Sequence, residues 1–241
     1  MGVIYEEGIA VVVGSALIGL CVPVVSLIWL VAPNAMLTVL CVLSAFWWMM
    51  AASAASLLWT ALNAGGWGSA AVIHMVLGVL LQEGARILLV AMYVRIERYL
   101  SNSCQGQGEA TLKNLRLNDI SLSLAAGTGW SLSHALLVFG TILAHNVPEL
   151  GTSYSEACPK MPVLVLSSVS SLLFAVLDMG LMYLAFWSVR RGSVAMLGVM
   201  VALHICVSLS TLLRAGPSYC YRVIICIILA ILCKSCKGKV K

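Results

Sequence analysis

Residues 79–90, VLLQEGARILLV, place two opposite charges inside a run of apolar side chains that extends over residues 69–95. A helix of about 20 apolar residues is long enough to cross the hydrocarbon core of a bilayer. Glu83 and Arg86 therefore lie within a predicted membrane span, and their spacing puts them on one helix face. An ionisable group at the bilayer centre costs roughly 2.5–3.5 kcal/mol. We expect the two charges to neutralise each other and to face protein.

The rest of the chain is equally apolar. Of its 241 residues, 61% are hydrophobic and 10% are charged, whereas a soluble domain carries roughly 25% charged residues. This composition excludes a water-soluble globule and predicts an all-α, polytopic integral membrane protein, because lipid offers no partner to an open strand edge. Continuous apolar runs also argue against a β-barrel, whose strands alternate.

We expect one transmembrane domain, residues 1–241, with turn residues between the spans. The seven predicted spans are 8–31, 35–62, 69–95, 119–146, 161–189, 193–213 and 218–233.

The basic residues predict the orientation of these spans. Ten of the 14 Lys and Arg residues fall on one side of the membrane: four between residues 95 and 118, two at 190–191 and four at 234–241. The positive-inside rule then places the amino terminus in the lumen or outside the cell and the carboxyl terminus in the cytoplasm. The net charge of +5 thus reflects topology. We expect contact with membrane lipid and no nucleic-acid partner.

The nine cysteines form no pattern typical of a disulfide framework or a metal site, and we expect no cofactor. Cys233 and Cys236 follow the last predicted span closely. Cysteines at such a membrane exit are candidates for palmitoylation, so we regard both as possible lipidation sites.

Two further polar residues lie within predicted spans. Asp178 is in span 161–189 and His204 is in span 193–213. If these helices form a hairpin, the two side chains lie at similar depth, and we expect a buried hydrogen bond between them. Together with Glu83 and Arg86 they would form a buried polar network. A relay for protons or substrate is the other interpretation of Glu83 and Arg86, and catalysis is the other interpretation of Asp178 and His204.

Small residues recur at every fourth position in span 119–146. Gly127, Ser131 and Ala135 fall on one stripe of the helix. Small side chains at this spacing let another helix approach closely. We therefore predict that the stripe is a packing and assembly face.

These features resemble the anterior-pharynx-defective (Aph) family, the multispanning scaffold subunit of gamma-secretase. LLQEGAR at residues 80–86 is similar to the family's Leu-Leu-Gln-Glu-x-x-Arg element, and AFWWMMAASAASLLW at residues 45–59 is similar to its second helix. The Gly127 stripe falls where the family has Gly-xxx-Gly-xxx-Gly, and His204 resembles its buried histidine in the sixth helix. The resemblance covers roughly residues 37–213.

The chain also departs from the family pattern. Ser131 and Ala135 replace two glycines of the stripe, and Asp178 stands where the family has a second buried histidine. The Asp–His combination would keep a polar contact with a different response to pH. The resemblance is therefore to a divergent member.

The resemblance implies a non-catalytic scaffold subunit. Its partners would be a presenilin-like aspartyl protease, a nicastrin-like glycoprotein and the presenilin enhancer subunit. The location implied is the endoplasmic reticulum, Golgi or plasma membrane. The cavity containing Asp178 and His204 would accept a partner's chain terminus.

Other functions remain open from the residues themselves. A rhomboid-type serine protease could use Ser131 as nucleophile and His204 as base, although Leu132 replaces the glycine expected after the serine. A small transporter could use Glu83 and Asp178, although the two halves of the chain show no internal repeat. An aspartyl protease needs two acids at one site. Only Asp178 is deep within a predicted span, so this function is disfavoured.

Overall fold

The computed structural model describes residues 2–65, 71–103, 118–146, 154–155 and 158–212. The elements in this part are α1 (Gly2–Ser26), η1 (Leu27–Val31), α2 (Ala35–Ala64), α3 (Ala71–Ser103), α5 (Asp119–His134), η2 (Ala135–Phe139), α6 (Gly140–Asn146), β1 (Tyr154–Ser155), β2 (Cys158–Pro162), α7 (Val163–Arg191) and α8 (Val194–Leu212). Here η marks a π-helical turn.

The described part contains six helical segments that are long and apolar enough to cross a membrane. They are Gly8–Val31, Ala35–Ala64, Val72–Asn102, Asp119–His145, Val163–Arg191 and Val194–Thr211. These segments follow the first six predicted spans in order and are consistent with a polytopic membrane protein. The predicted seventh span, 218–233, lies outside the described residues, so the span count and the orientation of the termini stay predictions.

Local sequence signals set several helix ends. The side chain of Asn34 accepts a hydrogen bond from the backbone N–H of Met36 at 3.0 Å and caps α2. Asn118 caps α5 in the same way through Ile120 N–H at 3.2 Å. Both amides satisfy a backbone donor that the first helical turn leaves free. Gly192, with φ +64°, ends α7 in a left-handed conformation that favours glycine and turns the chain into α8.

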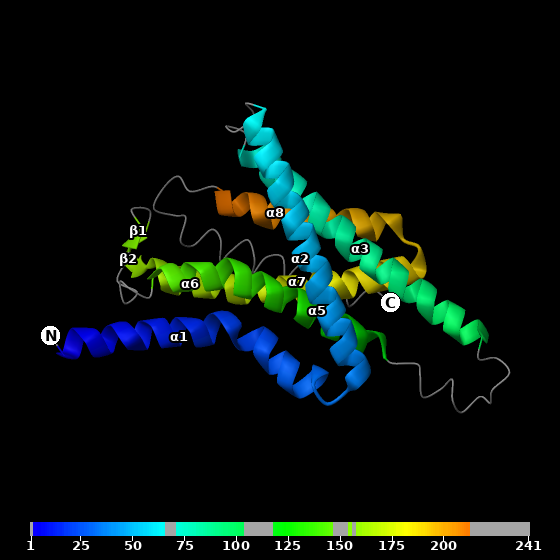
Figure 1. Cartoon of the computed structure of the whole chain (residues 1–241), viewed down its shortest axis with the longest axis horizontal. Coiled ribbons are helices and arrows are strands. Elements are labelled where there is room, and N and C mark those ends of the chain that lie inside the picture. Colours follow the sequence, from blue (N-terminus) through cyan, green and yellow to red (C-terminus); the bar gives the residue numbers. More distant parts are fainter. Residues whose placement is uncertain (1, 66–70, 104–117, 147–153, 156–157, 213–241) are drawn as a thin grey trace, which may run out of the picture.

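Two of the predicted spans contain π-helical turns, which the sequence analysis did not predict. In the first span, η1 follows Pro23, which has no N–H to donate within α1. Figure 1 shows the chain changing direction between α1 and α2. In the fourth span, η2 ends at Phe139, whose ring packs so closely on Gly19 that an added Cβ would lie 2.6 Å from it. The π turns thus accompany the contact between these two spans.

The connection before α7 contains a pair of short strands that the sequence analysis did not predict. β1 and β2 pair in antiparallel fashion, with Tyr154 opposite Pro162 and Ser155 opposite Cys158. The chain returns on itself at this point and enters α7 directly. The pair is too short for its alternation to stand out in the sequence.

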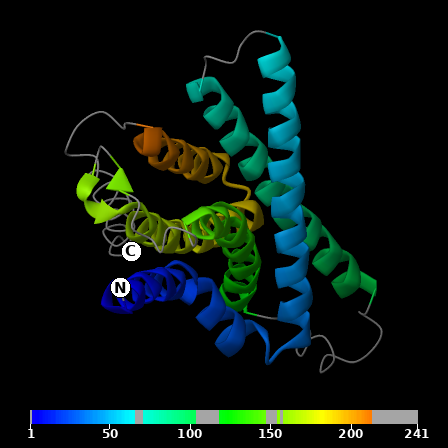
Figure 2. The same cartoon turned by 60° about the vertical axis from the view of Figure 1, so that its left-hand side comes forward.

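α5 lies at the centre of the helices and is the most buried of the six spans. It packs against α2 and α7, and α1 packs against both α5 and α7. Figure 2 shows α5 in green beside the long α2, with α3 crossing behind. α3 contacts α2, α7 and α8. This arrangement brings the middle of α3, α7 and α8 and the carboxyl end of α5 close enough for their polar side chains to meet.

Candidate functional site

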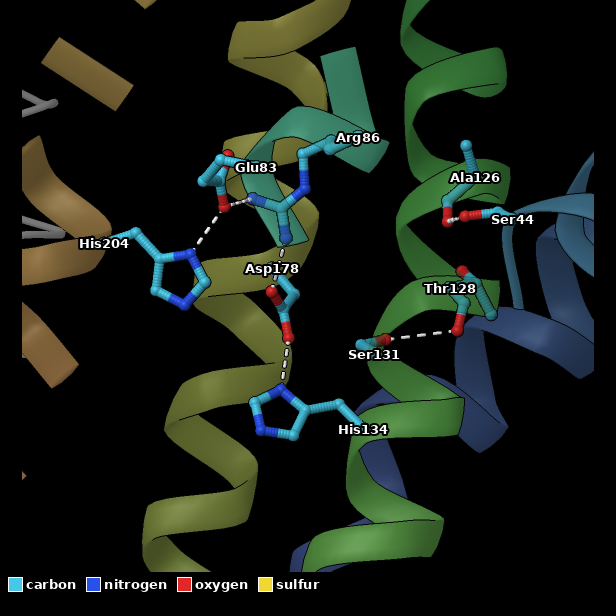
Figure 3. Close-up of polar contacts among 9 residues, drawn as sticks. All are labelled: Ser44, Glu83, Arg86, Ala126, Thr128, Ser131, His134, Asp178 and His204. Atoms are coloured by element: carbon cyan, nitrogen blue, oxygen red, sulfur yellow. Dashed lines mark hydrogen bonds and ion pairs between the residues drawn. The ribbon is translucent and has the colours of Figure 1, made fainter. Parts of the chain in front are cut away.

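Five ionisable side chains from four helices form a continuous chain of contacts inside the protein (Figure 3). His204 on α8 bonds to Glu83 on α3, and Arg86 donates to the same Glu83 oxygen. The second Nη of Arg86 donates to Asp178 Oδ1 on α7 at 2.7 Å. The other oxygen of Asp178 lies 2.8 Å from His134 Nδ1 on α5. We call these five residues the charge network.

Four of the five side chains in the charge network are almost completely removed from solvent, and the side chain of the fifth, His134, is 18% exposed. Arg86 is fully buried, and Glu83, Asp178 and His204 are at most 2% exposed. Buried charges persist only when they are paired and hydrogen-bonded, because leaving one unpaired is costly. Arg86 supplies one positive charge against two carboxylates, and each carboxylate also contacts an imidazole. Each carboxylate therefore has two hydrogen-bonding partners, Arg86 and one imidazole.

The aromatic ring of Trp130 completes the surroundings of Arg86. The guanidinium carbon lies 4.7 Å from the centroid of this ring. Trp130 is on α5 and is fully buried. A cation over an indole face is attracted by the ring quadrupole, most strongly when both are desolvated. Arg86 is thus held by Glu83, Asp178 and Trp130, which come from three different helices.

The structure brings the predicted polar residues together, but with one different pairing. Glu83 and Arg86 form the contact that their spacing suggests. The expected direct hydrogen bond between Asp178 and His204 is wrong, because each bonds to another side chain. The hairpin argument considered only α7 and α8. Arg86 reaches in from α3 and has enough donors to bond both carboxylates at once.

Sequence reasoning missed His134, the fifth member of the network. Its ring lies between Trp48 and Phe174, with centroid distances of 5.5 Å to each. A signal was present, because His134 follows Gly127 by seven positions and so lies on the same helix face. The resemblance implies a second buried histidine in the fifth span, but in this chain the fifth span, α7, has Asp178 at that position. The second histidine of the network, His134, comes instead from α5 in the fourth span.

The predicted stripe of small residues packs inside the chain. An added Cβ on Gly127 would lie 2.9 Å from the Cα of Met179, so α5 and α7 touch almost backbone to backbone. Ser131 and Ala135 are also buried. The Ser131 hydroxyl donates to the Thr128 carbonyl of its own helix at 3.2 Å. In the described structure the stripe is an internal packing face, and its place in assembly with other subunits stays a prediction.

A second close approach, on another face of α5, was not predicted. An added Cβ on Gly129 would lie 1.9 Å from the carbonyl oxygen of Cys41 on α2. Close by, the Ser44 hydroxyl donates to the Ala126 carbonyl at 2.6 Å. Gly129 is two residues from Gly127 and therefore points away from the stripe. α5 is thus held by Gly127 against α7 and by Gly129 against α2.

A separate ionic cluster joins three helices at one end of the molecule. Arg190 at the end of α7 lies 2.7 Å from Glu97 on α3 and 3.1 Å from Asp119 at the start of α5. These side chains are more exposed than the charge network. The Arg190 cluster ties together helices that Arg86 also connects deeper in the protein.

Ser131 and His204 do not form the Ser–His pair that a rhomboid-type protease would need. Ser131 bonds to its own helix and His204 bonds to Glu83, so neither is hydrogen-bonded to the other. Among the described residues, no group of three or more His, Cys, Asp or Glu side chains is placed to hold a metal ion. The possible lipidation sites Cys233 and Cys236 lie outside the part of the chain that the structure describes.

Comparison with known proteins extends the resemblance. A family model described as Aph-1 protein matches residues 10–240, which include most of the first predicted span and all but the last residue of the chain's carboxyl-terminal part. The chain is also similar to a protein of Arabidopsis thaliana named Gamma-secretase subunit APH1-like. The two are 27% identical over 198 residues, which cover 81% of this chain and 70% of the plant protein.

Proposed function

The chain belongs to the Aph-1 family, and on this premise we propose that it is a non-catalytic scaffold subunit of a gamma-secretase-like intramembrane protease complex. The scaffold supports the assembly and stability of the catalytic subunit and so contributes to intramembrane proteolysis and protein processing. Its partners are a presenilin-like aspartyl protease, a nicastrin-like glycoprotein and a presenilin enhancer subunit.

The charge network is the observation that carries this proposal. It is built around the LLQEGAR element, and its contacts connect α3, α5, α7 and α8. The acids that could act as general bases are already bonded to Arg86 or to an imidazole. Groups engaged in this way favour a fixed helix arrangement over proton transfer to a substrate. A fixed arrangement is what a scaffold has to offer its partners.

The outer faces of the helices are suited to contact with lipid and with other membrane subunits. Trp29, Leu17 and Val39 are among the most exposed of many large apolar side chains on α1, η1 and α2. Helix association within a membrane depends on such surfaces through packing. We place the chain, a multi-pass integral membrane protein, in the endoplasmic reticulum, Golgi and plasma membrane, with its amino terminus in the lumen or outside the cell.

Co-purification in mild detergent tests the proposed function. A tagged full-length chain, expressed in its own cells, is expected to recover a presenilin-like protease and a glycoprotein with a large ectodomain in constant proportion. Mass spectrometry of the recovered proteins identifies them. A multi-pass protein of another family, with the same tag, controls for non-specific recovery. Recovery of the chain alone, together with proteolysis by the purified chain that Ser131→Ala abolishes, would overturn the proposal.

A further inference from the structure

A cleft of about 340 Å³ lies between α2 and α3, near the carboxyl end of α2 and the start of α3. Ala55 and Gly78 lie in its lining, and an added Cβ on Gly78 would be 4.0 Å from the Ala55 Cβ. Larger side chains, Leu58, Leu62 and Met75, also line it. Small-molecule sites typically have about this volume and an apolar lining with few polar groups.

His74 lines this cleft beside the indole of Trp59, and the polar atoms of His74 have no partner. His74 is 8% exposed, yet neither of its ring nitrogens is hydrogen-bonded. Its ring and the ring of Trp59 pack edge to face, with a centroid distance of 4.0 Å and an interplanar angle of 78°. A neutral imidazole has one donor and one acceptor, and a buried polar group without a partner is costly. His134 and His204, by contrast, are both bonded.

The cleft has its polar end near one boundary of the membrane. His74 is close to the start of the apolar stretch Val72–Asn102, and Trp59 is of the residue type that gathers at membrane–water interfaces. Ala55 and Gly78 are each one helical turn further from these ends of α2 and α3. The site therefore offers a hydrogen-bonding group at the level of the interface and an apolar floor deeper in the membrane.

We propose that this cleft binds a sterol, whose hydroxyl group hydrogen-bonds to His74 once the imidazole turns toward the cleft, and whose ring system lies over Ala55 and Gly78. A hydroxyl can donate to one imidazole nitrogen or accept from the other. No charged side chain lines the cleft, so nothing there recognises the charged headgroup of a phospholipid. A rigid ring system also loses less conformational freedom on binding than a flexible acyl chain.

A second cleft on the same two helices is a built-in comparison. Its volume is about 320 Å³, and its lining includes Met50, Gly84 and Leu88. No residue in that lining has a buried polar atom without a partner. The two clefts are similar in size and apolar character, so a sterol that recognises the imidazole binds the first and not the second.

Photolabelling of the full-length chain in its native membranes tests the proposal. The probe is a photoreactive cholesterol analogue that keeps the free hydroxyl, and unlabelled cholesterol is the competitor. We expect saturable labelling of peptides containing residues 55–62 and 74–78, competed by cholesterol. Cholesterol methyl ether, which cannot donate a hydrogen bond, should compete less well. A photoreactive phosphatidylcholine is the comparison lipid and should give no saturable labelling there.

Matched variants locate the site. His74→Phe keeps an aromatic ring against Trp59 and removes the hydrogen bond, so the apparent affinity should fall roughly fivefold. Gly78→Leu fills the floor and should abolish labelling, whereas Gly84→Leu in the second cleft should leave it unchanged. Unchanged affinity in His74→Phe, or equal saturable labelling by the phospholipid probe, would overturn the proposal. The result does not depend on the proposed scaffold function, because probe binding alone is measured.

Discussion

Arg86 is the residue on which most of the buried contacts converge. It bonds to Glu83 within α3 and to Asp178 on α7, and it lies over the ring of Trp130 on α5. Seen from the sequence alone, loss of Glu83 would leave Arg86 unpaired. In the structure Asp178 still pairs with Arg86 after such a loss. Arg86 itself has no substitute, because removing it leaves two buried carboxylates without their cation.

We therefore predict that Arg86→Met destabilises the protein more than Glu83→Gln does. Removing one partner of a buried charge pair typically costs about 3–5 kcal/mol, and Arg86→Met should fall in that range. Thermal unfolding of the purified chain in detergent measures the difference. Arg191→Met is the matched control: Arg191 is exposed at the end of α7 and lies over the ring of Trp187, so its loss should cost no more than about 1 kcal/mol. Similar losses in Arg86→Met and Arg191→Met would contradict this view of the network.

His134 gives a second prediction at this scale. His134→Phe keeps a ring between Trp48 and Phe174 and removes the hydrogen bond to Asp178. A buried acceptor that loses its partner costs about 1–3 kcal/mol, so stability should fall by that amount. His145→Phe, on an exposed face of α6, is the matched control. If both variants unfold at the same temperature as the wild type, the His134 contact contributes nothing to stability.

At the scale of the element, α5 is held by two close approaches. Gly127 admits the backbone of α7, and Gly129 admits the backbone of α2. Neither neighbour can yield as a flexible side chain could, because Met179 Cα and Cys41 O belong to main chains. The position of α5 in turn sets where Trp130 and His134 meet the other helices.

Substitution of these glycines tests the packing of α5. Gly129→Ala places a methyl group where the Cys41 carbonyl stands, so we expect the yield of folded protein to fall severely. Gly140→Ala is the matched control, since its added Cβ would have its nearest neighbour at 4.0 Å. Alanine is preferred over glycine within a helix by about 1 kcal/mol, so this variant should be neutral or slightly stabilised. Fluorescence-detected size-exclusion chromatography compares the two, and normal folding of Gly129→Ala would count against so tight a crossing.

These elements also show what the sequence could predict. The length of the apolar runs was enough to predict all six described spans, because a helix needs a minimum number of apolar residues to cross the bilayer. The spacing of Glu83 and Arg86 predicted their contact, because it depends on one helix alone. Three features could not be predicted: the residue that pairs with Asp178, the contact of His134 and the close approach at Gly129. They depend on how the helices pack against one another, and the periodicity of a single helix does not determine that packing. The π turn η2 likewise accompanies a contact with α1.

At the scale of the whole molecule, the charge network and the Arg190 cluster fix α3, α5 and α7 at two levels. The first lies among buried helix faces and the second at one end of the helices. A chain fastened in this way presents its outer surfaces in a defined arrangement, which is the physical requirement for a scaffold. On this view, loss of Arg86 harms the complex by loosening the helices, without touching any catalytic group.

The abundance of the assembled complex tests this most directly. Cells lacking the endogenous chain are supplied with wild type, Arg86→Met or Arg191→Met, and the membranes are run on native gels probed for the presenilin-like and nicastrin-like partners. We predict that wild type and Arg191→Met restore the large complex and that Arg86→Met does not, even when its own level is matched by expression. Full restoration of the complex by Arg86→Met would contradict the account.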